Sequence, residues 1–81
     1  MKRVLYSKAA EKSMARMQPQ RRAAIFARVD AFACGENVDI RKLTGSALFR
    51  IRVGRDRVII DDQGVIVMVL DAGPRGGIYK E

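Results

Sequence analysis

The sequence predicts a single α+β domain over residues 1–81, in which an N-terminal strand precedes an antiparallel helical hairpin and a three-stranded antiparallel meander. Both helices are expected to pack on one face of the sheet. Three observations predict this fold. The chain of 81 residues suits one domain and leaves no room for a second. Apolar residues recur at helical spacing in the first half of the chain, and their period changes to two in the second half.

The first strand and the first helix are predicted from a short apolar segment and a capping residue. Val4–Tyr6 is expected to form a short strand. Ser7 is expected to cap the helix that follows, because its hydroxyl can accept a hydrogen bond from the free amides of the first turn. Helical spacing of apolar residues then extends this helix through Met17: Ala9, Ala10, Met14 and Met17.

The second helix has a signal at each end. Pro19 suits the first turn, where its missing N–H costs nothing. Gly35 lies where a left-handed residue is expected to end the helix. An apolar stripe at i, i+4 and i+7 is predicted to face the core: Ile25, Val29 and Phe32. Because the join at Gln18 is short, the two helices are expected to form an antiparallel hairpin.

The second half of the chain is predicted to hold three strands after a loop at Asn37–Gly45. Apolar residues alternate with charged ones in a hairpin that turns through residues 54–56: Phe49, Ile51 and Val53 in one strand, Val58 and Ile60 in the next. The continuous apolar run Val65–Leu70 predicts a strand in the middle of the sheet, covered on both faces. Gly73 and Pro74 are expected to end it.

The excess of positive charge and the absence of histidine limit the partners and the catalytic chemistry that we expect. Sixteen Lys and Arg against nine Asp and Glu give a formal net charge of +7, which attracts polyanions. Nucleic acid, an acidic protein and an anionic membrane surface are the candidates, and a merely solvated basic surface is the alternative. The chain contains no histidine, so histidine-dependent acid–base and nucleophilic catalysis are excluded.

The remaining composition predicts a cytoplasmic protein without metal or cofactor. No apolar run reaches the roughly 18 residues of a membrane span. The basic N-terminus has no apolar segment behind it, so no signal peptide is expected. The single cysteine, Cys34, cannot form an internal disulfide, and it cannot assemble a zinc site without histidines.

Register decides whether the arginines of the predicted hairpin share a surface. Since the apolar residues of its two strands must lie on one face, Arg50, Arg52 and Arg57 are expected on the opposite, outward face. Turns of two and of four residues both satisfy this condition, and the two-residue turn places Arg52 directly across from Arg57. Like charges facing each other destabilise a sheet, whereas the planar arginine fork grips phosphate in two contacts. The pattern therefore favours phosphate binding.

The C-terminal segment adds a second group of polar side chains. Its glycines make it conformable, and it follows a strand expected to lie beside the arginine hairpin: Gly73-Pro74-Arg75-Gly76-Gly77-Ile78-Tyr79-Lys80. We expect the segment to fold over one end of the arginine surface. Tyr79 could then stack on a base, hydrogen-bond a phosphate, or act as an acid or base. The alternative is an end of the chain whose Tyr79 only packs on the sheet.

Three segments together resemble one family. Leu48–Ile60 is similar to the hairpin of the RelE/ParE toxin superfamily, where an aromatic-basic-apolar-basic strand precedes a turn and a strand that begins with arginine. Asp39–Gly45 resembles the family's approach to that hairpin, and Gly73–Arg75 with Tyr79 resembles its C-terminal signature. The resemblance covers nearly the whole chain in the same element order.

The resemblance implies the toxin of a type II toxin–antitoxin pair, and the RelE-like branch is favoured. RelE-like members cleave mRNA in the ribosomal A site without a metal, by attack of a ribose 2′-OH on the adjacent phosphate. On this interpretation Arg57 and Arg75 stabilise the transition state, and Tyr79 orients the nucleotide. Arg52 completes the implied catalytic set. The implied RNA-binding residues are cations that hold the backbone: Lys42, Arg50 and Lys80.

Arg52 departs from the RelE-like pattern, where lysine is frequent at this position. Arginine does not lose its proton, so Arg52 is a poor general base. This departure keeps two alternatives open: a ParE-like inhibitor of DNA gyrase, and a catalytically inactive nucleic-acid-binding member. The toxin interpretations imply two partners, a cognate antitoxin with an acidic or amphipathic segment and mRNA on the ribosome, and no membrane.

Overall fold

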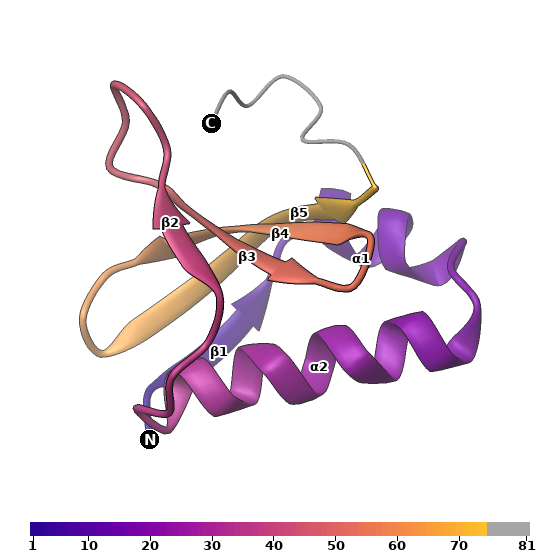
Figure 1. Cartoon of the computed structure of the whole chain (residues 1–81), viewed down its shortest axis with the longest axis horizontal. Helices are drawn as coiled ribbons and strands as arrows, with labels where there is room; N and C mark the ends of the chain where they lie inside the picture. Colours follow the sequence, from indigo (N-terminus) through magenta and orange to yellow (C-terminus); the bar gives the residue numbers. More distant parts are fainter. Residues whose placement is uncertain (75–81) are drawn as a thin grey trace.

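The computed structural model describes residues 1–74, which form one mixed sheet and two helices (Figure 1). The predicted α+β class is confirmed. The elements, in chain order, are β1 (Arg3–Tyr6), α1 (Lys8–Ala15), α2 (Pro19–Ala33), β2 (Ile40–Lys42), β3 (Phe49–Val53), β4 (Asp56–Asp62) and β5 (Ile66–Gly73). Neither helix of this part of the chain is long and apolar enough to cross a membrane.

The helix boundaries follow the predicted local signals closely. Ser7 caps α1, since its Oγ accepts a hydrogen bond from the Ala10 amide at 3.0 Å and donates one to the Leu70 carbonyl at 2.7 Å. Pro19 opens α2, and Gly35 follows that helix with φ of +85°. The first helix ends at Ala15, two residues before Met17, which nevertheless stays buried.

The sheet has five strands in the order β1-β5-β4-β3-β2. β1 runs parallel to β5, and every other neighbouring pair is antiparallel. The expected three-stranded meander is therefore extended by β2, and the prediction of a loop at residues 37–45 is wrong for Ile40–Lys42. This strand escaped the sequence pattern because it has only three residues, two of them charged. Its pairing with β3, not its composition, holds it.

The core lies between the two helices and one face of the sheet, which we call the covered face. In Figure 1, α2 runs along the lower side of the sheet, and α1 lies at its right-hand end. Ile25 and Val29 of α2 are fully buried there with Ile51, Val58 and Val67 of the strands. Burial of such side chains stabilises the fold by about 1.5–3 kcal/mol each.

The opposite face of the sheet carries no helix, and we call it the uncovered face. Val67 and Val69 of β5 point to the covered face and are fully buried, whereas Ile66 and Met68 on the other face are partly exposed. The expectation that this strand is covered on both faces is therefore wrong. Its apolar run reflects its place inside the sheet, between β1 and β4, and a helical layer on one face only.

A bulge in β5 keeps a carboxylate out of the core. Ile60 pairs with Val69, but the preceding residue of β4, Ile59, pairs with Asp71, so Leu70 is skipped. As a result Ala72, and not Asp71, lies opposite the fully buried Val58.

The tip of the β3–β4 hairpin is anchored to α2 by an ion pair. Asp56 is 2% exposed, and both of its carboxylate oxygens accept hydrogen bonds from Arg21, at 3.0 Å from Nε and 2.5 Å from Nη2. This two-point contact satisfies a buried charge that would otherwise destabilise the fold. It also fixes the orientation of the hairpin relative to the helices.

Candidate functional site on the uncovered sheet face

Four arginines from three neighbouring strands lie on the uncovered face, and together we call them the arginine face: Arg41, Arg50, Arg52 and Arg57. Directly opposite residues of antiparallel strands share a face. Arg41 of β2 is opposite Arg50 of β3, and Arg52 of β3 is opposite Arg57 of β4. The predicted gathering of hairpin arginines on one face, with Arg52 across from Arg57, is therefore observed.

The turn between β3 and β4 sets this register. Val53 pairs with Asp56, so only Gly54 and Arg55 form the turn. Gly54 has φ of +60°, and no non-glycine residue of the described chain has a positive φ, so the turn has its left-handed residue in the first central position. Glycine there defines a type II′ turn, whose twist matches that of the flanking strands. Of the two predicted turn lengths, the shorter one is present.

The four side chains differ in exposure. Arg41 and Arg52 are exposed and Arg57 is partly exposed, but Arg50 is only 3% exposed. The expectation that all three hairpin arginines face solvent is thus wrong for Arg50. It lies in the middle of β3 with a strand on either side, and its cross-strand neighbours Arg41 and Ile59 share its face. Arg50 thus adds positive charge to the arginine face from a buried position.

Lys42 and Arg41 lie on opposite faces of β2. Lys42 pairs with Phe49, which packs against the core, whereas Arg41 pairs with Arg50. The structure thus separates Lys42 from the arginine face and brings Arg41 to it. Sequence reasoning missed Arg41, because a segment predicted to be a loop has no alternation that assigns side chains to faces. The charged pair Arg41-Lys42 next to Ile40 was the available signal.

The C-terminal residues of the predicted site, Arg75, Tyr79 and Lys80, lie outside the described residues 1–74. The last described strand does end beside the arginine face, since Gly73 pairs with Arg57.

Apolar side chains occupy the other half of the uncovered face. Leu5 of β1 pairs with Met68 of β5, and Ile66 lies two residues before Met68 on the same face. Leu5 is 37% exposed, and the other two are partly exposed. The uncovered face therefore has a basic half on β2, β3 and β4, which holds the arginine face, and a second half on β1 and β5. The second half carries these apolar side chains together with Arg3, which is opposite Ile66, and Asp71, which is opposite Ile59.

The basic half suits phosphate groups and charge stabilisation better than proton transfer. Guanidinium groups donate in a planar fork that matches phosphate oxygens, and they do not give up a proton near neutral pH. Within residues 1–74, no three His, Cys, Asp or Glu side chains gather where they could hold a metal ion. Asp61 of β4, a carboxylate on the same face, accepts a hydrogen bond from Gln63 Nε2 at 3.0 Å. The arginine face can thus bind a phosphodiester and neutralise charge that develops on it.

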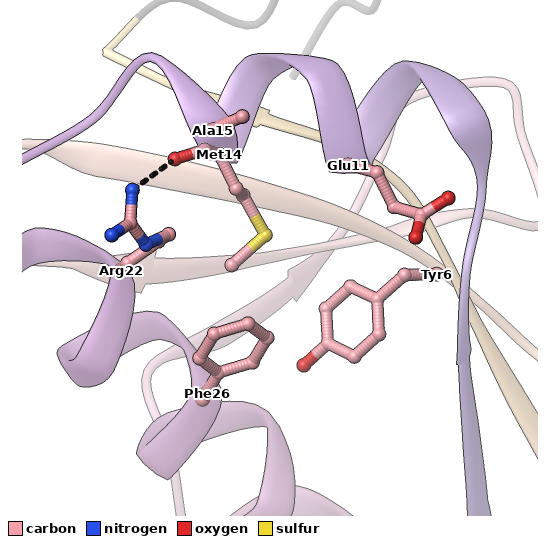
Figure 2. A pocket seen from close by; sticks show the side chains of 6 residues that line it. All are labelled: Tyr6, Glu11, Met14, Ala15, Arg22 and Phe26. Atoms are coloured by element: carbon pink, nitrogen blue, oxygen red, sulfur yellow. Dashed lines mark hydrogen bonds between the residues drawn. The ribbon is translucent and has the colours of Figure 1, made fainter. Parts of the chain in front are cut away.

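A separate cleft of about 380 Å³ lies between the helices and the end of β1 (Figure 2). Tyr6 meets Phe26 edge to face, with ring centroids 5.3 Å apart, and Phe26 is 43% exposed. Arg22 Nη1 donates to the Met14 and Met17 carbonyls at 3.3 and 3.0 Å, which ties the end of α1 to α2. Arg22 therefore has a structural role.

Tyr6 is not suited to proton transfer in this cleft. Burial, with a smaller contribution from Asp30, raises the pKa of Tyr6 to about 12. Its hydroxyl makes no hydrogen bond within residues 1–74. The cleft thus offers apolar side chains and a phenol that stays protonated at neutral pH, and it is a weaker candidate for chemistry than the arginine face.

Comparison with known proteins identifies the fold. No protein-family model and no curated protein matches the sequence. Among solved structures, a chain from the RelB–RelE antitoxin–toxin complex of Methanococcus jannaschii is 24% identical, with 91% of this chain and 93% of that chain covered and a TM-score of 0.75. A chain from the archaeal RelE–RelB complex of Pyrococcus horikoshii OT3 is 25% identical, with 93% and 96% covered and a TM-score of 0.73.

A third similar structure comes from a bacterium. A chain from the toxin–antitoxin complex RelBE2 of Mycobacterium tuberculosis is 22% identical, with 91% of this chain and 98% of that chain covered and a TM-score of 0.60. The chain thus has the RelE-like fold over nearly its full length, and the resemblance found in the sequence is confirmed at the level of the fold.

Proposed function

We propose that this protein is the toxin of a type II toxin–antitoxin pair and that it cleaves mRNA on the ribosome. The observation that carries the proposal is the arginine face, four arginines of three strands on the one sheet face without helices. The fold supports it, since the similar structures are toxin–antitoxin complexes. Because a fold alone does not imply a function, the arginines are the main support for this activity.

The proposed chemistry is transfer of the phosphodiester within the RNA. The ribose 2′-oxygen attacks the adjacent phosphorus, its proton leaves to a base, and the P–O5′ bond breaks as the 5′-oxygen gains a proton. The products are a 2′,3′-cyclic phosphate and a 5′-hydroxyl end. Arg52 and Arg57 stabilise the charge that accumulates on the phosphoryl oxygens in the transition state.

The proton transfers need a group other than the arginines. A guanidinium does not accept a proton, so Arg52 and Arg57 act by charge and by hydrogen bonding. Tyr79 remains our proposed participant, with Arg75 as a further cation and Lys80 as a backbone contact. The ribosome would align the mRNA so that the 2′-OH is oriented for attack, and this orientation would provide the rest of the rate enhancement.

The proposed partner that neutralises the toxin is an antitoxin with an acidic, amphipathic segment. Its acidic side chains would face the arginine face, and its apolar side chains would cover Leu5, Ile66 and Met68 on the adjoining half. Such a segment would both offset the net charge of +7 and remove apolar surface from water.

The test is induced expression followed by mapping of mRNA ends. We expect new 5′-hydroxyl ends within codons of translated mRNAs. Arg57→Ala, Arg75→Ala and Tyr79→Phe are each expected to lower cleavage by about 100-fold or more, as for loss of a group that stabilises transition-state charge or takes part in proton transfer. Arg28→Ala, which removes an exposed arginine of α2, is the matched control. Undiminished cleavage by Arg75→Ala would refute the proposed site.

One observation favours a second function. Arg52 stands where RelE-like nucleases often have lysine, and this favours a ParE-like inhibitor of DNA gyrase that needs no proton acceptor there. A supercoiling assay separates the two functions. Inhibition of gyrase together with intact mRNA on translating ribosomes would replace the nuclease by the gyrase inhibitor.

A further inference from the structure

We propose that the ion pair between Arg21 and Asp56 holds Arg52 and Arg57 in the position that cleavage requires, which makes Arg21 and Asp56 positioning residues. The inference rests on the proposed function, because it concerns the two arginines that stabilise the transition state there. It adds an effect on the rate of cleavage to the structural role of the ion pair. Asp56 would act without touching the RNA, since it is buried on the covered face opposite Val53.

The tip of the β3–β4 hairpin, residues 53–56, extends beyond both neighbouring strands. β2 pairs with β3 only as far as Ile51, and β5 pairs with β4 only from Arg57 onward. In the described chain, Val53 and Asp56 therefore pair with each other and with no third strand. An isolated pair of strands is only marginally stable in water. The direction of the tip thus depends on its contacts outside the sheet.

Val53 and Asp56 tie this tip to the rest of residues 1–74. Val53 packs in the core, and the Asp56 carboxylate accepts two hydrogen bonds from the Arg21 guanidinium. An apolar contact resists separation but has no preferred direction, whereas the planar guanidinium fork sets both the distance and the angle of a carboxylate. The ion pair therefore determines how the tip is oriented relative to α2.

The orientation of the tip sets the place of the two arginines next to it. Arg57 directly follows Asp56 in β4, and successive side chains of a strand point to opposite faces. Holding Asp56 on the covered face thus also places Arg57 on the arginine face. Arg52 lies directly opposite Arg57 and moves with it. Because stabilisation of developing charge requires donors that are already in place, a small rotation of the tip would lower the rate.

An ion pair is not the most stabilising contact for this place. Moving two charges out of water costs free energy, and replacing a buried ion pair by apolar residues of similar volume is often neutral or stabilising. An apolar pair lacks the directional hydrogen bonds that Arg21 and Asp56 make. Charges at the base of the tip therefore fit a requirement for geometry better than a requirement for stability.

The experiment measures mRNA cleavage by the full chain on ribosomes, for the unmodified sequence and for the double variant Arg21→Met/Asp56→Leu. An apolar contact replaces the ion pair in this variant. Initial rates over a range of ribosome concentrations separate the maximal rate from the concentration that gives half of it. Arg28→Met, which removes an exposed arginine of the same helix, is the matched control. Melting temperatures show whether each variant is folded.

We expect the double variant to melt within about 5 °C of the unmodified chain, whereas its maximal cleavage rate falls about tenfold or more. The ribosome concentration for half-maximal rate should change less than about twofold, because the lost effect belongs to the transition state. Arg21→Lys keeps the charge but loses the planar fork, and it should lower the maximal rate about threefold or more. Arg28→Met should leave both quantities unchanged.

A double-mutant cycle tests whether the ion pair acts through Arg57. With Arg57→Ala already present, the further change of Arg21 and Asp56 to Met and Leu should lower the residual rate by less than about threefold, since one of the positioned arginines is absent. An equal fold-loss with and without Arg57 would show that the ion pair acts independently of this arginine. That result would overturn the inference.

The remaining outcomes separate the inference from the proposed function. Full cleavage by a folded double variant would overturn the inference, while a loss of cleavage in Arg57→Ala would still support the proposed function. If the double variant does not fold, an unchanged maximal rate in Arg21→Lys would overturn the inference instead. If the unmodified chain does not cleave mRNA on ribosomes, the proposed function fails, and the inference fails with it.

Discussion

The two faces of the sheet use arginine in opposite ways. On the covered face, Arg21 holds the buried carboxylate of Asp56 with two hydrogen bonds. On the uncovered face, Arg41 and Arg52 are exposed and make no ion pair with any carboxylate of residues 1–74. The second ion pair of this part of the chain, between Lys2 and Asp62, also lies at the covered side, because Asp62 pairs with the fully buried Val67.

This difference follows from solvation. A charge beneath the helices has lost water and needs a partner, so a carboxylate and a guanidinium appear there together. The exposed charges of Arg41 and Arg52 keep their water, so they need no carboxylate partner. Positive charge can therefore accumulate on the uncovered face without unfolding the domain. Burial with an ion pair therefore marks Arg21 as structural, whereas exposure to solvent makes Arg41 and Arg52 candidates for binding.

The largest expected contrast lies between a core residue and an exposed arginine. Ile25→Ala removes a fully buried side chain from the covered face and should lower the free energy of unfolding by about 2–5 kcal/mol. Arg52→Ala should change it by less than about 0.5 kcal/mol, because its side chain is exposed. Urea denaturation of both variants measures the contrast. A large loss of stability in Arg52→Ala would show that the arginine face is structural and would contradict this expectation.

A smaller effect is expected for the carboxylates of β4, which face opposite sides of the sheet. Asp56→Asn removes the charged partner of Arg21 and should lower the melting temperature by roughly 5–15 °C, since a hydrogen-bonded buried charge is lost. Asp61→Asn, on the uncovered face of the same strand, should lower it by no more than about 2 °C. Calorimetry tests the pair. Equal shifts in melting temperature for the two variants would mean that the buried ion pair of Asp56 stabilises the fold no more than the carboxylate of Asp61 does.

The smallest expected effect concerns pH and the Lys2–Asp62 pair. The hydrogen bond from Lys2, with a further one from the Gly64 amide, holds the pKa of Asp62 below its ordinary value. A lowered pKa in the folded state stabilises the protein above the unfolded pKa of about 3.9, and this stability is lost as pH falls through the folded value.

Asp62→Asn should therefore lower the free energy of unfolding at pH 7 by no more than about 1 kcal/mol, because the pair is partly exposed and screened by solvent. The difference from the unmodified protein should shrink as pH falls through the depressed pKa. Denaturation curves at several pH values between 2 and 7 measure it. A difference that does not change with pH would mean that the charge of Asp62 plays no part.

The helix ends and the arginine pairing could be predicted because their causes are local. The cap at Ser7, the start at Pro19 and the left-handed Gly35 depend on residues within one helical turn. Arg52 lies across from Arg57 because alternation and a short turn leave few registers. These features need no knowledge of the rest of the chain.

Other features of the site could not be predicted, because distant segments determine them. β2 is a strand because β3 pairs with it, and this pairing alone brings Arg41 to the arginine face and takes Lys42 away from it. Arg50 is buried although alternation places it on the uncovered face, where residues of two other strands, Arg41 and Ile59, lie directly opposite it. The partner of Asp56 is thirty-five residues away on α2, a contact that no local pattern indicates.

Local sequence patterns are sufficient to predict both helices, the central hairpin and the alternation that separates its arginines from its apolar residues. The excess of positive charge also follows from the composition alone. Only the folded structure reveals which face of the sheet is covered, which strands form its edges, and which cations form an ion pair with a carboxylate. The physical reason is that alternation fixes only the side of a strand on which a residue lies. Solvation and pairing depend on what packs against that side, and those groups come from distant parts of the chain.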